Sequence, residues 1–268
     1  MKDLVILNNE ILNYSVINAL WLSSASLYGK GIFTTVRILN SRPFRWENHW
    51  QRLVQQSKKI RLDLSGHSTD STLRSLRELL ETNKIGNGRA RITFSDETSS
   101  NVWPFETLKK TSLLIVTGDF RAVTDNFRLT LSPYPVNSRS PLAGVKSCNY
   151  LEQIMSLDEA KGRGFHEAIR VNENGYVTSG CMANVFWLKN GQMFTPSLTT
   201  GCLAGTTREF VLENIECSEV EAEIDELQKA DVIFLTSAGL GIIQATEFEA
   251  KKLGLDDHPV LHLLAELI

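Results

Sequence analysis

Two Asn-Gly dipeptides, each placed between stretches in which apolar residues alternate with polar ones, constrain the second half of the chain more than any other feature. The stretch EAIRVNENGYVTSG turns at Asn174-Gly175, and the stretch NVFWLKNGQMFTP turns at Asn190-Gly191. Asn-Gly flanked by alternating apolar residues is the strongest short-range signal for a β-hairpin. Two antiparallel hairpins so close together favour an α+β fold over a regular alternation of parallel strands and helices.

The first half of the chain alternates predicted strands and helices. Residues 31–46, 89–95 and 112–118 are rich in β-branched and aromatic residues, which predicts strands. Apolar residues recur at helical spacing in residues 47–62, and a second helix is predicted to begin after the polar stretch at 67–71.

A lapse of this pattern marks the expected domain boundary. The stretch GDFRAVTDNFR is polar and carries no regular spacing of apolar residues, so we place the linker there. The prediction is a smaller N-terminal α/β domain over residues 1–122 and a larger C-terminal domain over residues 123–268.

Composition excludes several classes of function. The 268 residues carry a formal net charge of -3, and no apolar stretch approaches the roughly 20 residues that span a bilayer, so we expect neither a nucleic acid nor a membrane as partner. The N-terminus shows no signal peptide. The four cysteines lie far apart without a CxxC pair, and His258 and His262 have no third ligand nearby. We therefore expect reduced thiols, no metal site and a cytoplasmic location.

One lysine stands where a helix is predicted to begin, in the stretch SPLAGVKSCNYLEQ. Lys146 comes just before the apolar run of that helix, although the helix dipole favours cations at the opposite end. A side chain that simply reaches solvent is the ordinary explanation for such a lysine. The composition of other segments is needed to distinguish that explanation from a functional role for Lys146.

Three other segments carry groups suited to binding a phosphate. LAGTTR places Thr206 and Thr207 at a predicted helix start, and LTSAG offers Ser237 in a tight turn. Arg52 lies in a predicted helix. Helix N-termini, hydroxyls and a guanidinium together make anion sites, although each alone more often serves as a cap, a turn or a solvated charge. Their presence beside an isolated lysine suggests an aldehyde cofactor that carries a phosphate.

Three blocks of the chain resemble the signature segments of the class IV aminotransferases. The blocks are YGKGIFTTVRILNSRPFRWENHWQRL, GVKSCNYLEQIMSLDEAKGRGFHEAIRVNENGYVTSGCMANVFWLKNGQMFTP and GCLAGTTREFVLE. This family comprises pyridoxal-phosphate enzymes of fold type IV, including branched-chain and D-amino acid aminotransferases and aminodeoxychorismate lyase. The resemblance implies a two-domain α+β enzyme, usually a homodimer, that binds a small amine or amino acid and holds pyridoxal 5'-phosphate between its domains.

The resemblance also implies roles for single residues. Lys146 matches the lysine that forms the Schiff base with the cofactor. Arg52 matches the arginine that binds the cofactor phosphate, and Thr207 with the N–H of Thr206 matches the helix start that holds the other phosphate oxygens. These four residues form the core of the expected site.

Further residues match the surroundings of the cofactor in this family. Leu203 corresponds to the residue packed against the pyridine ring, and Tyr150 to a residue near the phenolic oxygen. Ser237 and Ala238 fall on the second phosphate loop, where several relatives carry a threonine that Ala238 lacks. Ser179 stands where the family pattern leads us to expect a glutamate that pairs with the protonated pyridine nitrogen. A serine makes a weaker electron sink of the ring, because it cannot stabilise the pyridinium as a carboxylate does.

Substrate residues are harder to assign. Thr35 in FTT is a candidate for a substrate contact, with an ordinary strand threonine as the alternative. Arg91 is a candidate partner for a substrate carboxylate, with a solvated strand face as the open alternative, and Arg89 is assigned to a solvated strand face.

The resemblance favours a lyase over a transaminase. The segments FTT, LAGVK and CMANVFW resemble aminodeoxychorismate lyase, and the EVTP run common in transaminases is absent after LTSAG. The implied reaction eliminates pyruvate from 4-amino-4-deoxychorismate to leave p-aminobenzoate, a step of folate biosynthesis. Two alternatives stay open. One is an amino acid transaminase acting on branched-chain or D-amino acids with a 2-oxo acid, and the other is a degraded relative that still binds the cofactor.

Overall fold

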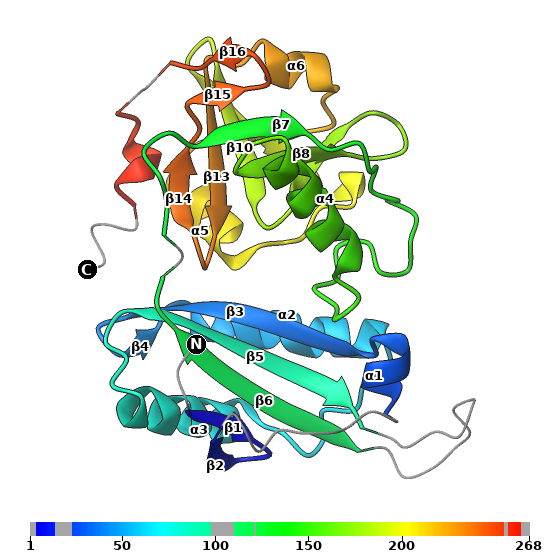
Figure 1. Cartoon of the computed structure of the whole chain (residues 1–268), viewed down its shortest axis with the longest axis vertical. Helices are drawn as coiled ribbons and strands as arrows, with labels where there is room; N and C mark the ends of the chain where they lie inside the picture. Colours follow the sequence, from blue (N-terminus) through cyan, green and yellow to red (C-terminus); the bar gives the residue numbers. More distant parts are fainter. Residues whose placement is uncertain (1–3, 14–22, 98–109, 121, 255–256, 264–268) are drawn as a thin grey trace. The chain divides into compact units, whose positions relative to one another are not determined.

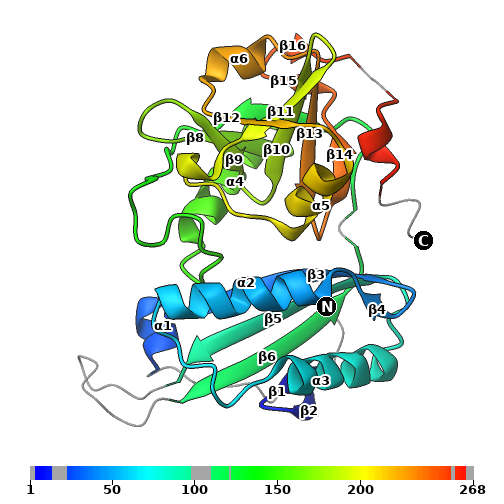
Figure 2. The same ribbon diagram turned by 180° about the vertical axis from the view of Figure 1, so that it is seen from behind.

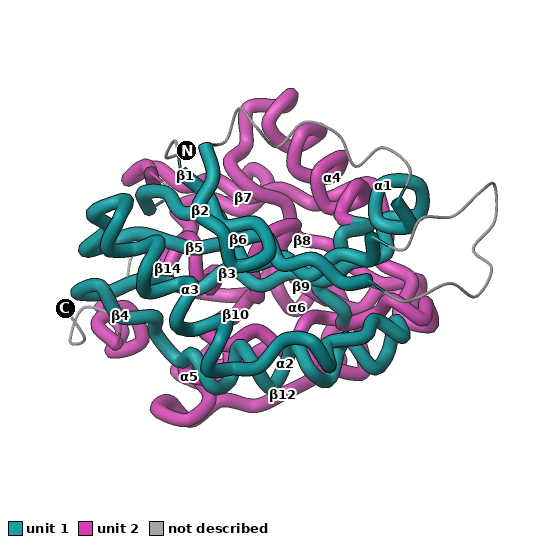
Figure 3. Tube along the Cα trace, turned by 90° about the horizontal axis from the view of Figure 1, so that it is seen from below, with its two compact units in different colours: residues 1–120, 145–149 teal, residues 121–144, 150–268 magenta. Residues whose placement is uncertain are grey.

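The computed structural model describes residues 4–13, 23–97, 110–120, 122–254 and 257–263. Its contacts divide the chain into two compact units, which are unit 1 with residues 1–120 and 145–149 and unit 2 with residues 121–144 and 150–268 (Figure 3). The predicted division after residue 122 assigned Lys146 to the C-terminal domain, whereas the contacts group Val145–Asn149 with unit 1.

Unit 1 is built on a six-stranded antiparallel sheet with the strand order β2-β1-β6-β5-β3-β4 (Figures 1 and 2). Its strands are β1 (Leu4–Leu7), β2 (Glu10–Asn13), β3 (Gly31–Leu39), β4 (Arg42–Pro43), β5 (Gly88–Asp96) and β6 (Thr111–Gly118). Its helices are α1 (Ser24–Tyr28), α2 (Trp46–Lys59) and α3 (Thr69–Thr82).

The core of unit 1 lies between the sheet and the helices α2 and α3. Leu53 of α2 and Leu76 of α3 belong to one buried cluster with Phe94 of β5. α3 begins after Ser68, whose side chain and that of Ser71 each accept a hydrogen bond from the other residue's backbone N–H in a capping box. Both helices confirm the helical spacing read from the sequence.

Unit 2 contains two five-stranded sheets, one with the order β12-β11-β10-β13-β14 and the other with the order β16-β15-β7-β8-β9. The first comprises β10 (Asn184–Lys189), β11 (Gln192–Pro196), β12 (Ser218–Val220), β13 (Val232–Ser237) and β14 (Gly241–Gln244). The second comprises β7 (Arg128–Leu131), β8 (Glu167–Val171), β9 (Val177–Gly180), β15 (Glu247–Phe248) and β16 (Lys251–Lys252). The helices of unit 2 are α4 (Leu151–Gly162), α5 (Thr206–Asn214) and α6 (Ile224–Gln228).

A buried cluster joins the two sheets of unit 2. Leu129 and Ile169 enter it from one sheet, and Val185 and Leu235 enter it from the other. The mixture of antiparallel and parallel pairs confirms the predicted α+β fold.

Both predicted hairpins are present, with different turns. Between β10 and β11, Asn190 and Gly191 have φ values of 52° and 75°, the pair of positive φ angles that a two-residue primed turn requires. Between β8 and β9 only Gly175 has a positive φ, of 82°, and the register shifts between Arg170 and Val171. The hairpin of β8 and β9 is therefore less regular than its Asn174-Gly175 dipeptide predicts.

Three further findings bear on the predictions. No helix in the described ranges is long and apolar enough to cross a membrane. The four cysteines, all of which the structure describes, form no disulfide. The sequence HPVLHLLAELI has the apolar content of a short helix, whereas the structure describes only a 3-10 turn at Pro259–Leu261, and residues 264–268 lie outside the described residues.

Candidate active site

Lys146 is fixed by its backbone against β3 and α2 within unit 1. Phe33 N–H donates to the carbonyl oxygen of Lys146 at 2.9 Å, and Cys148 N–H donates to the carbonyl oxygen of Gly31 at 2.8 Å. The N–H of Lys146 donates to Oε1 of Gln56, in α2, at 3.1 Å. The backbone of Lys146 is thereby held by β3 on one side and by α2 on the other.

The amine of Lys146 lies in an environment that disfavours its charge. The side chain is half-buried, and Nζ lies 4.6 Å from the centroid of the Phe33 ring. Burial, followed by the positive charges of Arg52 and Arg91, lowers the pKa of Lys146 to about 7. Near pH 7 the Lys146 amine is therefore neutral in about half of the molecules, and the neutral amine is the nucleophilic and basic form.

Arg91 shares the Phe33 ring with Lys146. Its Cζ lies 3.6 Å from the ring centroid, and its Nε donates to Oγ1 of Thr93 at 3.2 Å. Thr35 lies directly opposite Arg91 in the register of β3 and β5, so the two side chains share one face of the sheet. The structure thus brings Arg91, one of the two tentative substrate residues, to the ring that Lys146 contacts.

Two more arginines lie on that face. Arg37 is directly opposite Arg89, and its Cζ lies 4.0 Å from the centroid of the Phe120 ring. Burial lowers the pKa of Arg37, and its buried Nε has no hydrogen-bond partner among the residues that the structure describes. Arg89 is exposed, as the sequence predicts. Like charges directly opposite each other are destabilising unless an anion compensates them.

Arg52 lies on the helix-covered side of the same sheet, in a chain of hydrogen bonds. Its Nη2 donates to Oγ1 of Thr34 at 2.8 Å, and this oxygen lies 2.6 Å from Nδ1 of His49. Thr34 and His49 are 0% and 1% exposed. Burial, then the charges of Arg52, Lys146 and Arg45, holds the pKa of His49 well below its ordinary value, so its ring is neutral.

Sequence reasoning missed Thr34 and His49. The available signal was weak: His49 stands three residues before Arg52 on a predicted helix, which places the two on one helix face. Nothing in the sequence aligned that face with Thr34, because the pairing depends on how β3 packs against α2.

The predicted phosphate residues of unit 2 lie at the start of α5. Gly205 is the N-cap, and Thr206 and Thr207 form the first turn, 6% and 5% exposed. A Cβ at Gly205 would lie 2.1 Å from Oδ1 of Asn184, so the position admits only glycine without rearrangement. First-turn N–H groups and the helix dipole favour anions at such an end.

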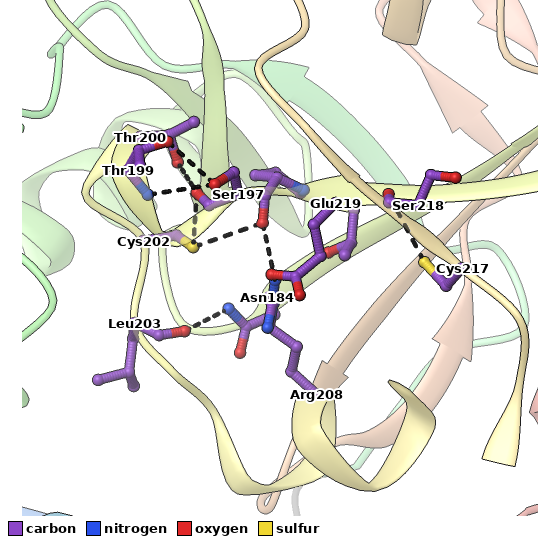
Figure 4. Close-up of polar contacts among 12 residues, drawn as sticks. Asn184, Ser197, Thr199, Thr200, Cys202, Leu203, Arg208, Cys217, Ser218 and Glu219 are labelled. Atoms are coloured by element: carbon purple, nitrogen blue, oxygen red, sulfur yellow. Dashed lines mark hydrogen bonds and ion pairs between the residues drawn. The ribbon is translucent and has the colours of Figure 1, made fainter. Parts of the chain in front are cut away.

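Asn184 connects the start of α5 to the predicted ring-packing residue. Its Nδ2 donates to the carbonyl oxygen of Leu203 at 2.8 Å (Figure 4). Arg208, one residue after the predicted threonines, donates to the carbonyl oxygen of Pro196 at 2.9 Å and forms an ion pair with Glu219 (Figure 4). The charge of Arg208 is thereby paired with that of Glu219. Thr206 and Thr207 remain the first two residues of α5.

Ser237 ends β13, and its Oγ accepts a hydrogen bond from Leu240 N–H at 3.1 Å in the turn that holds Ala238. Beside it, Oγ1 of Thr236 is buried and has no hydrogen-bond partner within the described part of the chain. Tyr150 is the N-cap of α4, with a half-buried side chain that makes no cap hydrogen bond.

Ser179 lies opposite a buried arginine. In the register of β8 and β9 it pairs with Arg170, which is 2% exposed. Nη2 of Arg170 lies 3.4 Å from the carbonyl oxygen of Pro135 and 3.5 Å from Oε2 of Glu152. The residue paired with Ser179 across the two strands is therefore a cation. The family pattern places a carboxylate at the position of Ser179, and this chain has a serine there.

Comparison with known proteins gives a consistent result. The family model described as amino-transferase class IV matches residues 31–248. Aminodeoxychorismate lyase of Bacillus subtilis (strain 168) is 30% identical over 237 residues, which cover 85% of this chain and 80% of the relative. The crystal structure of Escherichia coli branched-chain amino acid aminotransferase is 23% identical with a TM-score of 0.89, covering 100% of this chain and 94% of that chain. The branched-chain aminotransferase of the archaeon Thermoproteus uzoniensis, solved with norvaline, has a TM-score of 0.90 at 23% identity, covering 98% and 92%. At these identities the two structures establish the likeness of fold.

Proposed function

The chain belongs to the class IV aminotransferase family, and we propose that within this family it acts as an aminodeoxychorismate lyase, releasing pyruvate from 4-amino-4-deoxychorismate to leave p-aminobenzoate. It is an enzyme that depends on pyridoxal 5'-phosphate. The observation that carries the proposal is that the Lys146 amine and the Arg91 guanidinium lie over one Phe33 ring, 4.6 Å and 3.6 Å from its centroid.

The residues present fit the cofactor. When bound, pyridoxal 5'-phosphate supplies an aldehyde that bonds to amines and a ring that accepts electron density. Lys146 offers an amine of which a large part is neutral near pH 7, because its pKa is lowered to about 7, and Arg52 offers a guanidinium for the phosphate. Thr206 and Thr207 offer the start of a helix of nine residues, behind a glycine whose Cβ would clash with Asn184.

We assign the remaining cofactor contacts from the family pattern. Ser237 and Ala238 would hold further phosphate oxygens, Leu203 would pack against the ring, and Tyr150 would lie near the phenolic oxygen. Ser179 would donate a hydrogen bond at the ring nitrogen. Its neighbour Arg170 supports the assignment of a weakly stabilised pyridinium, because a nearby cation disfavours a second positive charge.

In the proposed reaction Nζ of Lys146 acts as a general base. It takes the proton from the ring carbon of the substrate that carries the amine. The neighbouring carbon–oxygen bond breaks with its electron pair going to the oxygen, and the leaving enolpyruvate takes up a proton to become pyruvate. The six-membered ring becomes aromatic, so the product supplies driving force that an amino transfer lacks. A weak electron sink at Ser179 is compatible with this reaction.

The arginine-bearing face of the unit 1 sheet supports the same substrate. Aminodeoxychorismate carries two carboxylates, whereas a branched-chain amino acid carries one carboxylate and an apolar side chain. Arg91, beside Lys146 on the Phe33 ring, is the proposed carboxylate partner, with Thr35 opposite it. Arg37 and Arg89 add positive charge to that face.

We further propose that the enzyme is a homodimer in the cytoplasm. Three apolar side chains of α4, Leu151, Ile154 and Met155, are 68%, 42% and 47% exposed. Exposed apolar side chains on one helix favour association with a second copy. Sedimentation of the purified chain tests this, and a monomer at micromolar concentration would contradict it.

A product assay tests the proposed function. The chain loaded with pyridoxal 5'-phosphate is given aminodeoxychorismate, and separately D-alanine or leucine with 2-oxoglutarate, and the products are scored as p-aminobenzoate or new amino acid. We expect p-aminobenzoate to form at least about tenfold faster than any amino acid. Amino transfer as the faster reaction would establish the transaminase alternative, and the absence of all three products would establish the degraded relative.

A further inference from the structure

The geometry of unit 1 points to a positioning role for two residues outside the predicted site. We infer that Thr34 and His49 hold the guanidinium of Arg52 in place, and through it set the electrostatic environment of the Lys146 amine. The assignment of Arg52 to a phosphate group rests on the proposed function, whereas the link from Thr34 to Lys146 does not.

The three side chains form one hydrogen-bonded series from two elements of the fold. β3 supplies Thr34, and α2 supplies both His49 and Arg52, one turn apart. Oγ1 of Thr34 lies 2.6 Å from Nδ1 of His49 and 2.8 Å from Nη2 of Arg52. The hydroxyl therefore connects the ring to the guanidinium, and both Thr34 and His49 are buried.

The direction of these hydrogen bonds follows from the chemistry of the three groups. A guanidinium only donates, so Thr34 Oγ1 accepts from Arg52. The hydroxyl keeps its own proton, which can donate to Nδ1 of His49 in the tautomer that leaves this nitrogen unprotonated, and we assign that tautomer here. The charged groups that act on His49 are Arg52, Lys146 and Arg45, all positive. A protonated ring would add a fourth positive charge and a competing donor, so the neutral ring stabilises the series.

The position of Arg52 affects the Lys146 amine through the charge of the guanidinium. Arg52 is the charged neighbour with the largest effect on the Lys146 amine, ahead of Arg91. When the acceptor at Thr34 is removed, the guanidinium of Arg52 loses one of the contacts that orient it, and a shift away from the amine weakens their interaction because solvent screens the pair. Loss of the Thr34 hydroxyl should therefore raise the pKa of Lys146 towards that of an ordinary lysine.

A purely structural role makes a different prediction. A buried threonine–histidine pair that only completes the core would lower the free energy of unfolding when it is broken, with no specific change at Lys146. The two roles are distinguished by reading the Lys146 amine itself. The test compares Thr34→Val, which keeps the shape and removes the hydroxyl, with Thr34→Ser, which keeps the hydroxyl.

The measurement is the pH dependence of acetylation of Lys146 by acetic anhydride in the full chain freed of cofactor, read by mass spectrometry of the peptide that contains it. We expect Thr34→Val to raise the pKa of this amine by about one unit and Thr34→Ser to leave it unchanged. Thr117→Val is the matched control, because Thr117 is a buried threonine of β6 whose Oγ1 accepts from Nδ2 of Asn83 at 2.9 Å. It should lower stability without shifting the amine.

A second pair of variants guards against misfolding at position 34. His49→Asn keeps an acceptor near the place of Nδ1 and should behave like the wild type, whereas His49→Leu removes the acceptor and should behave like Thr34→Val. Equal titration of Lys146 in the wild type, Thr34→Val and His49→Leu would overturn the positioning role. So would a shift in Thr34→Ser as large as that in Thr34→Val.

A binding experiment separates this inference from the proposed function. Dissociation constants are measured for pyridoxal 5'-phosphate and for pyridoxal, which lacks the phosphate. Thr34→Val should weaken binding of the first about tenfold and leave the second unchanged, because only the phosphate depends on Arg52. Equal weakening of both would contradict the link to Arg52. A wild-type chain that binds neither compound would overturn the proposed function, while the titration of Lys146 would still decide the positioning role.

Discussion

The candidate residues of the two units differ in their chemistry. Unit 1 carries the Lys146 amine and the guanidinium of Arg91 over one aromatic ring, and the charges of Arg52 and Arg91, after burial, lower the pKa of that amine. Unit 2 contributes neutral donors, namely the first turn of α5 behind Gly205 and the hydroxyl of Ser237. Two buried arginines of unit 2 each face a carboxylate, since Arg208 binds Glu219 and Arg170 lies near Glu152. The difference shows that the charges of Arg52 and Arg91 act on the Lys146 amine, whereas those of Arg208 and Arg170 act on carboxylates.

The largest expected effect comes from removing that amine. Lys146→Ala should lower the rate of p-aminobenzoate formation by on the order of 10⁴-fold, because the variant loses the group that takes the proton. Turnover is measured by product release, and thermal unfolding of the same variant shows whether the fold persists. Residual turnover above about one hundredth of the wild-type rate would show that Lys146 is not the general base. Unit 1 would then not supply the reactive amine.

The next effect concerns pH and tests the charge of unit 1. The pKa of Lys146 is lowered to about 7, so the amine is protonated below pH 7 and neutral above it. The association rate of pyridoxal with the cofactor-free chain should fall about tenfold per unit below pH 7 and be flat above it. Stopped-flow absorbance measures this rate, and pyridoxal is used because it has no phosphate to titrate. A rate that keeps rising to pH 10 would show an ordinary lysine.

A smaller effect is expected at the neutral helix start of unit 2. Gly205→Ala places a Cβ 2.1 Å from Oδ1 of Asn184, so either the first turn of α5 or the Asn184 side chain, which donates to the Leu203 carbonyl, has to move. Binding of pyridoxal 5'-phosphate should weaken about tenfold, and binding of pyridoxal should hardly change. Isothermal titration measures both. An equal loss of affinity for both compounds would mean that the start of α5 does not bind the phosphate.

The smallest effect is expected at Ser179. Ser179→Glu introduces the carboxylate of the family pattern opposite Arg170, which would pair with it in part. We expect lyase turnover to stay similar or to fall by about twofold to threefold, and any amino transfer to leucine or D-alanine to rise. Both rates come from one preparation. A rise in lyase turnover with no amino transfer would show that the weak electron sink is a defect of this chain.

Part of this site could be predicted from the sequence, because it depends on local signals. Lys146, Thr206 and Thr207 stand beside predicted helix starts, and both hairpins followed from their Asn-Gly dipeptides. What could not be predicted depends on packing between elements distant in the sequence. The contact of Lys146 with Phe33 spans more than a hundred residues, and the assignment of Val145–Asn149 to unit 1 follows from hydrogen bonds to β3. No periodicity in the sequence encodes either.

The neighbours of Ser179 teach the same lesson. The sequence showed that an expected carboxylate was absent, but only the register of β8 and β9 revealed a buried arginine across from it. Because a register shift interrupts this hairpin at Arg170 and Val171, counting from the turn would not have paired the two residues reliably.

The central claim is that unit 1 supplies the covalent anchor of the cofactor through Lys146. The most direct measurement is reduction of the chain loaded with pyridoxal 5'-phosphate by borohydride, followed by peptide mass spectrometry. We predict one phosphopyridoxyl group per chain, carried by the peptide that contains Lys146 and lost in Lys146→Ala. A phosphopyridoxyl group on any other lysine, or none after reduction, would contradict the account.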